Sequence, residues 1–348
     1  MLATTKPKRV LIALSGGVDS SVCVHLLKEQ GYEVAGVVFD MSPAHTKTVN
    51  AAKDSARSLD IPLFVKNLHK EFNENVISYF VSEYLEGRTP NPCVVCNPLV
   101  KFKTLLDTAN ENNYDYIATG HYVGIDNDNG IFRIKCGDSK QRDQSYMLYR
   151  LGQDVLSRLI LPLSGFSKDH VREIAANLGL SCATAPDSQD NCFISDNDYT
   201  KYIENFCKTP IKKGHFVAPD GTIIGEHKGI IHYTVGQRKG LGVALGKPVF
   251  VKKIDPKNGD VFLVEDKDAC EDFVFISNVH IISGKMPARP FQCTVKIRST
   301  ATPVPAEAIP LESGDMKIVF NTPQRFPAVG QSLVIYNNEY VTGGGWLS

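Results

Sequence analysis

The stretch VLIALSGGVDSSVCVHLL, residues 10–27, places a polar, glycine-bearing loop between an apolar strand and an apolar helix. Its glycines at 16 and 17 let backbone amides approach an anion, and the helix N-terminus adds a partial positive charge. The loop has neither the Gly-Lys-Ser/Thr ending of a Walker A loop nor the glycine spacing of a dinucleotide fold. An ordinary serine-capped turn is the alternative, but the flanking strand and helix favour a phosphate-binding loop.

Outward from this loop, roughly the first 195 residues alternate short apolar strands with longer amphipathic segments, such as EVAGVVF at 33–39 and TVNAAKDSARSLD at 48–60. Alternation of this kind predicts βαβ units and a parallel sheet. In KDHVREIAANLGL, residues 168–180, apolar residues recur at helical spacing, with Ser167 as the cap and Gly179 as the stop.

After about residue 200 the pattern changes to glycine-rich turns and short alternating strands, as in PVFVKKIDPKNGDVFLV at 248–264. The KNGD in this segment indicates a hairpin. The sequence therefore predicts an α/β domain at residues 1–200, followed by two small, mainly β domains. We expect the first of these at 201–275 and the second, barrel-like one at 276–348.

The composition narrows the class of protein. A chain of 348 residues with 43% hydrophobic residues is typical of a multidomain globular protein. No apolar run reaches the length of a membrane helix or of a signal-peptide core, so we expect a cytoplasmic location and no membrane association. The net charge is zero, but residues 200–260 hold 11 lysines and arginines against 5 aspartates and glutamates. This segment is a candidate phosphate-binding face, although a charge run is usually solvated surface.

Nine cysteines in a cytoplasmic chain do not suggest a disulfide framework, and most are expected to be small core residues. Cys93 and Cys96 differ because prolines surround them, just before a predicted helix with Asn97 as its N-cap and Pro98 at its first position. A thiol beside a helix N-terminus has a lowered pKa. Cys96 is therefore a candidate reactive thiolate.

A third candidate, Cys192, follows a polar run that does not suit a buried core. Structural zinc would need four ligands, commonly from a second CxxC or a CxxH, and the chain has neither. A simple pair of core thiols does not suit the flanking proline and aspartate residues either.

Several motifs together show a resemblance to a known family. SGGVDS at 15–20 resembles the PP-loop of the ATP pyrophosphatase superfamily, which thiolases, amidotransferase-type synthetases and NAD synthetases share. With it stand GRTPNPCVVCNPLVKF, ATGHY, RDQSYMLY, DSQDNCFI and YTVGQRKGLGV, in that order from residue 87 to residue 243. On these motifs the chain is similar to the tRNA-specific 2-thiouridylase family, which converts the wobble uridine of certain tRNAs to 2-thiouridine. The similarity extends to GQSLVIY at 330–336.

The resemblance implies binding of ATP and Mg²⁺, with Asp19 helping to hold the metal. The implied ATP contacts are Ala13, Leu14, Ser15, Gly16, Gly17, Val18, Asp19, Ser20, Phe39 and Gly120. Family members often have methionine where this chain has Phe39.

The resemblance also implies the chemistry of two cysteines. Cys96 stands at the place of the family's nucleophile, and Cys192 at the place of the cysteine that receives a persulfide. ATP would adenylate the uridine C2 oxygen, sulfur from the Cys192 persulfide would displace AMP, and a Cys96–Cys192 disulfide would remain. The implied partners are tRNA and a sulfur donor, either a cysteine desulfurase or a sulfur-relay protein.

The tRNA contacts implied by the resemblance are spread over the chain. Asn91, Pro92 and Cys93 fall where the family contacts the target base. The remaining contacts are His121, Arg142, Asp143, Gln144, Arg238, Lys239, Arg298 and Gln331. Arg238 and Lys239 lie on a glycine-rich loop of the basic segment, where they suit phosphate contact. Arg298 lacks the second aromatic and basic residues that usually follow it in the family.

One departure from the family leaves two mechanisms open. Family members commonly have aspartate where this chain has Cys93. Three thiolates, from Cys93, Cys96 and Cys192, would suit three ligands of a 4Fe–4S cluster with one open iron, an arrangement similar to that of several PP-loop tRNA thiolases.

Two other functions also remain open. One is a PP-loop synthetase that delivers nitrogen to a small adenylated acid, for which the three cysteines would be incidental. The other is a tRNA-binding protein with a vestigial nucleotide site, for which the intact SGGVDS loop would have no use.

Overall fold

A computed structural model describes residues 7–184, 191–207, 211–243 and 246–348. The first part of the chain forms a five-stranded sheet in the order β3-β2-β1-β4-β7, in which every pairing is parallel. Its strands are β1 (Arg9–Ala13), β2 (Glu33–Asp40), β3 (Leu63–Asn67), β4 (Tyr116–Ala118) and β7 (Leu159–Ile160). The chain passes to one side of β1 for β2 and to the other side for β4. Ligands of open α/β sheets bind at such a switch point, beyond the carboxyl ends of the strands.

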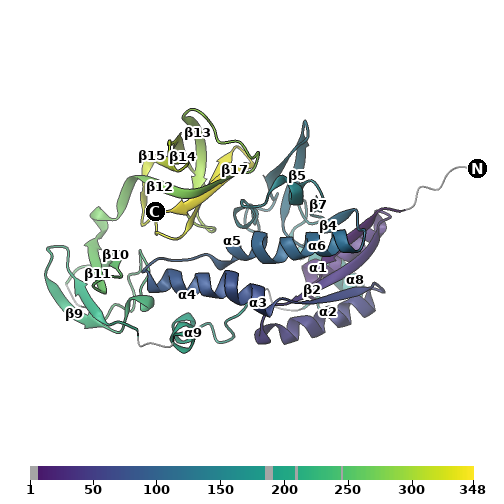
Figure 1. Cartoon of the computed structure of the whole chain (residues 1–348), viewed down its shortest axis with the longest axis horizontal. Helices are drawn as coiled ribbons and strands as arrows, with labels where there is room; N and C mark the ends of the chain where they lie inside the picture. Colours follow the sequence, from purple (N-terminus) through teal and green to yellow (C-terminus); the bar gives the residue numbers. More distant parts are fainter. Residues whose placement is uncertain (1–6, 185–190, 208–210, 244–245) are drawn as a thin grey trace, which may run out of the picture.

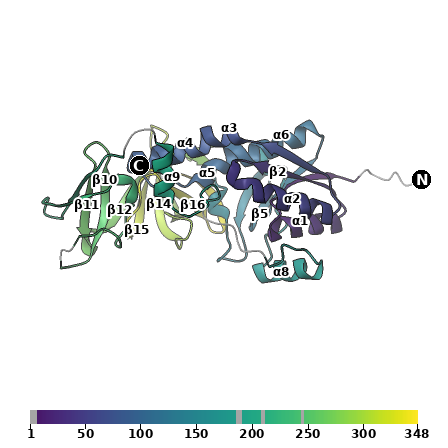
Figure 2. The same ribbon diagram turned by 90° about the horizontal axis from the view of Figure 1, so that it is seen from below.

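Helices cover both faces of this sheet (Figures 1 and 2). The helical elements of this part of the chain are α1 (Val18–Glu29), η1 (Pro43–His45), α2 (Thr46–Ser58), α3 (His69–Phe72), η2 (Asn73–Ile77), α4 (Ser78–Leu85), α5 (Pro92–Cys96), η3 (Asn97–Phe102), α6 (Lys103–Glu111), η4 (Ser145–Met147), α7 (Gln153–Leu156) and α8 (Lys168–Asn177). Strand β1 contributes to two cores because its side chains alternate between faces. Val10 and Ile12 pack with residues of α1, α2 and α8, whereas Leu11 packs on the other face with residues of α4 and α6.

The helix predicted at 168–180 forms as α8, with its predicted cap. The Ser167 hydroxyl accepts a hydrogen bond from the His170 amide, and Gly179 has a φ of 65° just beyond the helix end. The predicted α/β class is likewise confirmed by the parallel sheet with helices on both faces.

The middle of the chain is a small β unit. Helix α9 (Tyr199–Phe206) leads into a four-stranded sheet in the order β10-β11-β8-β9. The elements are β8 (Gly214–Val217), β9 (Ile223–His227), η5 (Ile230–His232), β10 (Val249–Asp255) and β11 (Asp260–Glu265). Strands β10 and β11 form the hairpin that KNGD predicted, with Gly259 at a φ of 84°.

The C-terminal part is a closed barrel. Its strands run in the order β12-β15-β14-β13-β16-β17, and β17 pairs back to β12. The elements are η6 (Asp266–Asp268), β12 (Cys270–Ile281), β13 (Phe291–Lys296), β14 (Val304–Pro310), β15 (Met316–Arg325), β16 (Ser332–Asn337) and β17 (Tyr340–Leu347). The predicted barrel is confirmed, while the domain limits at 200 and 275 stay predictions.

One hairpin was not predicted from the sequence. Strands β5 (Val123–Asp128) and β6 (Ile131–Cys136) leave the first domain after β4, and β6 pairs with β17 of the barrel through Lys135 and Tyr340. The hairpin therefore ties the N-terminal domain to the barrel, and Figure 1 shows it, labelled at β5, on the side of the barrel where β17 lies. In the part of the chain that is described, no helix has the length and apolarity needed to span a membrane.

Candidate active site

The predicted phosphate loop follows β1 directly and is held by its own serines. The Ser20 hydroxyl accepts from the Ser15 amide at 3.2 Å, and the Ser15 hydroxyl accepts from the Gly17 amide at 3.3 Å. Gly16 has a φ of 75°, and a Cβ there would lie 2.3 Å from the backbone carbon of Ala51. The loop thus lies directly against α2, and its shape depends on glycine at this position.

The loop also has the donors that an anion needs. Gly17 is the N-cap of α1, and it provides no side-chain cap to the first-turn amides. Gly120, which follows β4, lies directly against this first turn. A Cβ at Gly120 would lie 3.2 Å from both the Asp19 Cβ and the Ser20 amide nitrogen. Amides at a helix N-terminus beside a close glycine backbone fit a pyrophosphate group. The residues predicted from SGGVDS and ATGHY therefore come together.

The other predicted ATP residues offer mainly their backbones. Leu14 and Phe39 are 1% and 8% exposed, and their side chains lie in the two hydrophobic cores. The Leu14 amide donates to the Val37 carbonyl, while Ala13 ends β1. Any nucleotide contact at these positions would involve main-chain atoms, which is compatible with the change from methionine to phenylalanine at 39.

Asp19 is paired with two residues that the sequence did not point to. Both of its carboxylate oxygens accept from the Lys168 ammonium at 2.7 Å, and one also accepts from the Tyr122 hydroxyl at 2.5 Å. Burial, followed by this carboxylate, raises the pKa of Tyr122, so its hydroxyl remains a proton donor. Lys168 lies 149 residues from Asp19 in the chain, and no local pattern links the two.

The helix around the cysteines starts earlier than predicted. Asn91 is its N-cap, α5 begins at Pro92, and the helix continues through the π-helical segment η3 into α6. The expectation that Asn97 caps the helix is wrong: Asn97 is buried and donates its side-chain amide to the Met147 carbonyl at 2.9 Å. Pro98 lacks the N–H of a regular α-helical turn, and the π-helical turn accommodates it inside the helix.

This shift changes the environment of the thiols. Cys93, not Cys96, lies in the first helical turn, and Cys96 is 3% exposed within the continuous helix. Burial raises the pKa of Cys96 to about 12, with Lys101 opposing the shift. The prediction that a helix N-terminus makes Cys96 a thiolate is therefore wrong for this conformation. At neutral pH Cys96 is a protonated thiol.

The π-helical segment also changes which side chains are buried. Val100 is 1% exposed, whereas Leu99 is 50% exposed. A regular helix would have placed Leu99 on the same face as Phe102.

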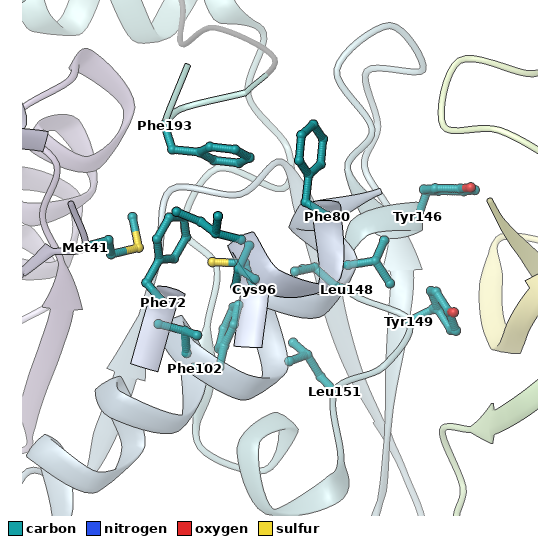
Figure 3. Close-up of a cluster of buried hydrophobic side chains, with 14 of the residues drawn as sticks. Met41, Phe72, Phe80, Cys96, Phe102, Tyr146, Leu148, Tyr149, Leu151 and Phe193 are labelled. Carbon is teal, nitrogen blue, oxygen red and sulfur yellow. The ribbon is translucent and has the colours of Figure 1, made fainter. Parts of the chain in front are cut away.

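Cys192 is held near Cys96 by its neighbour. Phe193 packs edge-on against Phe72 and Phe80, with ring centroids 5.7 and 5.2 Å apart, and belongs to the core cluster that contains Cys96. Figure 3 shows Phe193 above Phe72 and Cys96. Cys192 itself is exposed, although desolvation by surrounding atoms raises its pKa. Of the motif DSQDNCFI, residues 187–190 lie outside the described residues.

Lys101 is the cation of this cluster, and sequence analysis missed it. Desolvation alone would lower its pKa, but Cys96, Cys192 and Cys93 outweigh that effect and raise it. Among the described residues its ammonium makes no hydrogen bond and no carboxylate ion pair. The signal available in the sequence was a lysine between two apolar residues, Val100 and Phe102. Both of these side chains are 1% exposed in the structure.

The predicted tRNA residues of the first domain are mostly used within the chain. Asp143 accepts from the Gly137 and Ser145 amides and from Lys296 of the barrel. The Gln144 side chain accepts from the Tyr122 amide at 3.0 Å. These contacts fix the loop before η4, while Arg142 is exposed.

His121 and Asn91 also have partners. His121 stacks on Phe102 at 5.9 Å, and its Nδ1 is 2.8 Å from the Thr119 hydroxyl. Burial, followed by Lys101, lowers the pKa of His121 to about 4, so the ring is neutral at pH 7. The Asn91 amide is 3.6 Å from the Met147 sulfur, and Pro92 is buried.

The later tRNA candidates fall into two groups. Arg238 and Lys239 are exposed, as phosphate contact requires. Arg298 instead donates to the carbonyls of Val235 and Phe326, and Gln331 donates to those of Thr89 and Pro90. Arg298 and Gln331 therefore brace the barrel against the middle unit and against the segment before Cys93. Contact of any of these residues with tRNA stays a prediction.

The comparisons with known proteins divide the chain in three. The family described as "tRNA methyl transferase HUP domain" matches residues 8–196, "tRNA methyl transferase PRC-barrel domain" matches 201–265, and "Aminomethyltransferase beta-barrel domain" matches 271–347. The fold and the loop thus define a HUP-domain protein fused to two β domains.

Curated relatives narrow this class. The tRNA-specific 2-thiouridylase MnmA 2 of Clostridium botulinum is 44% identical over 97% of this chain and 97% of its own length. The MnmA enzymes of Acetivibrio thermocellus and Clostridioides difficile are 44% and 41% identical, each over 97% of this chain and over 98% and 97% of their own lengths. This chain belongs to the tRNA-specific 2-thiouridylase family, so the resemblance drawn from its motifs is confirmed.

Proposed function

We propose that this chain transfers sulfur to C2 of the wobble uridine of tRNA in an ATP-dependent reaction. One observation carries the proposal: the phosphate loop and the Cys96 cluster lie at the same edge of one parallel sheet. The loop follows β1, and Lys101 of the thiol cluster lies close enough to His45, just beyond the end of the neighbouring strand β2, to lower the pKa of that histidine. The relatives named tRNA-specific 2-thiouridylase match nearly the whole chain.

The first step is activation of the base. The uridine C2 oxygen attacks the α-phosphorus of ATP, pyrophosphate leaves, and the oxygen becomes part of a good leaving group. The first-turn amides of α1 and the hydroxyls of Ser15 and Ser20 would hold the pyrophosphate. A carboxylate in the first turn suits a hard divalent cation, so Asp19 would help hold Mg²⁺, which would neutralise phosphate charge.

The second step moves sulfur through two cysteines. A persulfide-bearing donor protein gives its outer sulfur to exposed Cys192, which becomes a persulfide, and the donor recovers its thiol. Cys96 attacks the inner Cys192 sulfur, so hydrosulfide leaves and a Cys96–Cys192 disulfide forms. Hydrosulfide then attacks C2 and AMP departs, which leaves 2-thiouridine. An external dithiol supplies the two electrons that restore both thiols.

Lys101 supports this sulfur chemistry because it opposes the raised pKa values of both cysteines. An ammonium close to Cys96 and Cys192 stabilises a thiolate or persulfide anion relative to its protonated form. We assign it the role of counter-charge for the sulfur that attacks. Cys93 is not needed for any step.

The cluster mechanism is less well supported by these residues. Among the described residues no group of three or more cysteine, histidine, aspartate or glutamate side chains is arranged to hold a metal ion. The three thiols instead lie close enough to the Lys101 ammonium to raise its pKa. The arrangement does not fit a three-cysteine cluster, so no step is assigned to one.

The remaining contacts belong to tRNA. The exposed Arg238 and Lys239 suit phosphate groups, and Asn91, Pro92 and Cys93 begin the helix that carries Cys96, where the target base would lie. The descriptions of two matching families mention methyl transfer. A pair of cysteines near an ATP-binding loop favours sulfur transfer instead, because thiols serve as nucleophiles in that reaction.

A thiolation assay with cysteine variants tests the proposal. The protein is incubated with tRNA, MgATP, cysteine and a cysteine desulfurase, and AMP and 2-thiouridine are quantified. We expect C96A and C192A to reduce 2-thiouridine at least about hundredfold. C93A and the exposed-cysteine control C270A should keep it within about threefold of wild type.

Other outcomes would contradict specific parts of this scheme. Iron in protein purified without oxygen, lost together with thiolation in C93A, would support a cluster instead of the disulfide cycle. Turnover of ATP that needs a small acid rather than tRNA, and that is unaffected by C96A and C192A, would indicate the synthetase function. Binding of tRNA without AMP formation would indicate a vestigial nucleotide site.

A further inference from the structure

His45 has a buried polar atom that the fold does not use. The residue is 4% exposed, and its Nε2 has no hydrogen-bond partner among the described residues. Burying a polar group in this way costs about 1–3 kcal/mol. His45 is the N-cap of α2, yet its side chain makes no capping bond to that helix. An apolar side chain would suit the fold better, so the explanation for this histidine lies in what Nε2 can bind.

The imidazole is held in place next to the reactive thiols. Its Nδ1 is 2.9 Å from the Ser42 hydroxyl, and the ring packs edge-on against Phe72 with centroids 5.9 Å apart. Phe72 belongs to the hydrophobic cluster of Cys96, and Figure 3 shows the Cys96 sulfur pointing towards it. Phe72 also packs against Phe193, the neighbour of Cys192. One phenylalanine thus joins the imidazole to the segments that carry both thiols.

Lys101 lies close to the same groups. Its ammonium lowers the pKa of His45 and opposes the raised pKa values of Cys96 and Cys192. The π-helical segment η3 explains this placement, because five residues make about one turn of a π-helix and so bring Lys101 to the Cys96 side. In a regular α-helix the same spacing would turn the lysine about 140° away. At pH 7 two neutral thiols and a neutral imidazole thus share one nearby ammonium.

We propose that His45 Nε2 and the Lys101 ammonium form a binding site for the hydrosulfide anion on its way from Cys192 to the tRNA base. This inference rests on the proposed function, because hydrosulfide arises in that reaction. The ammonium supplies the opposite charge. Nε2 supplies a hydrogen bond in either ring tautomer. When the Ser42 hydroxyl donates to Nδ1, Nε2 donates to the sulfur; when Nδ1 donates to Ser42, Nε2 accepts the S–H.

The site retains the sulfur between its two covalent states. Hydrosulfide leaves Cys192 when the Cys96 sulfur bonds to the inner sulfur of the persulfide. Its electron pair then forms the C2–S bond, and the C2–O bond to AMP breaks. The S–H proton passes to N3 of the base, which lost its own proton on adenylation. No further reactant is needed.

Free sulfide tests the site separately from the persulfide. The C192A variant receives sodium sulfide in place of a donor protein, without oxygen and with tRNA and MgATP, and 2-thiouridine is quantified. We expect C192A/H45M to have a KM for sulfide about fivefold to thirtyfold above that of C192A, with little change in kcat, because one buried hydrogen bond to the anion is lost. C192A/H45Q should recover most of the affinity, since glutamine offers both a donor and an acceptor.

Azide binding gives a readout that needs no turnover. Azide is a monoanion whose infrared stretching band reports its surroundings, and hydrosulfide should displace it. We expect H45M to bind azide about fivefold to thirtyfold more weakly than wild type, and H45Q to bind it nearly as well. The control is H227Q, because His227 is equally buried but its two ring nitrogens contact the Gly259 carbonyl and the Gly229 amide. H227Q should keep the azide affinity of wild type, and thermal melting shows that each variant is folded.

The outcomes separate this inference from the proposed function. An unchanged KM for sulfide in C192A/H45M, unchanged azide binding in H45M, or equal losses in H45M and H45Q would make His45 a packing residue. Thiolation by wild type with a donor protein, but none by C192A with sulfide, would show that hydrosulfide is never free and would also overturn the site. In each of these cases the proposed function stands. If wild type forms no 2-thiouridine from any sulfur source, the proposed function fails, whereas azide binding that is lost in H45M would still support an anion site.

Discussion

The phosphate loop and the thiol cluster lie at the same edge of one sheet, but they are built in opposite ways. The loop is local: Ser15, Gly17 and Ser20 bond to one another, and the first turn of α1 has no side-chain cap. The cluster joins Cys96 and Lys101, which lie on one continuous helix, to Cys192 from a distant segment, and burial keeps Cys96 protonated. The nucleotide site is thus formed before ATP binds. The Cys96 thiol, in contrast, stays protonated and unreactive until its surroundings change.

The largest effect on the phosphate loop is expected from a substitution at Gly16. Alanine there would require a φ of 75° and would place its Cβ 2.3 Å from the Ala51 backbone. We expect G16A to lower ATP affinity at least about hundredfold and the free energy of unfolding by about 2–4 kcal/mol. Calorimetry and thermal melting measure the two effects.

Gly31 supplies the control for this variant. It has a φ of 83°, but nothing lies within 4 Å of its ideal Cβ. G31A should therefore lose about 1 kcal/mol of stability and keep its ATP affinity. If G16A binds ATP as well as G31A does, the loop is not the rigid cradle described here.

A substitution at Lys101 separates the two sites, because loss of this cation should slow sulfur transfer without changing nucleotide binding. We expect K101M to reduce the thiolation rate about tenfold to a hundredfold while ATP affinity stays within about twofold. Alkylation of Cys192 should also need a higher pH in K101M, since the cation that lowers its pKa is gone. K103M, at a neighbouring lysine whose side chain is 65% exposed, should behave as wild type. Equal effects of K101M and K103M would remove Lys101 from the mechanism.

Protonation of His121, whose pKa Lys101 helps to lower, should destabilise the folded chain at acid pH. Its folded-state pKa of about 4 lies below the ordinary value of 6.5, so the unfolded chain binds a proton that the folded chain does not. Stability should be unaffected by this group above pH 6.5 and fall as the pH drops from 6.5 towards 4, by about 2–3 kcal/mol in total. Denaturant unfolding of wild type and H121Q across this range measures the difference. An identical pH slope in both proteins would show that the ring titrates normally.

The smallest effect is expected at Arg298, which joins the barrel to the middle unit. R298A removes two donations to the carbonyls of Val235 and Phe326, so the barrel and the middle unit should be held together less firmly. We expect a loss of about 1 kcal/mol in stability and a rise of a few fold in the KM for tRNA, with kcat unchanged. R289A, at an exposed arginine of the same barrel, is the control. A fall in kcat with R298A would mean that this arginine acts on the chemistry.

Sequence reasoning succeeded where structure is local. The strand, loop and helix at residues 10–27, the helix starting at Ser167 and the hairpin at KNGD each depend on neighbours within a few positions. The start of the cysteine helix was missed because Asn97 and Pro98 form a good local cap, while the tertiary structure buries Asn97 and uses a π-helical turn.

The residues that sequence reasoning missed have partners far away in the chain. Lys168 contacts Asp19, which is 149 positions away in the chain. Lys101 becomes the cation of a thiol pair only when the fold brings Cys192 close to Cys96. The pairing of β6 with β17 is also invisible to any local pattern. Composition and periodicity do not encode such contacts, so only the fold discloses them.

The contacts of Gln331 with Thr89 and Pro90 have a consequence for biosynthesis. Gln331 is made 242 residues after Thr89, yet it donates to the segment that leads into the cysteine helix. The Thr89 amide likewise donates to the carbonyl of Val329. On the ribosome the N-terminal domain emerges first, but its catalytic segment receives these anchors only after most of the barrel has been translated. A nascent chain therefore reaches its working geometry late, and a chain cut short before residue 329 would carry the thiols without the frame that holds them.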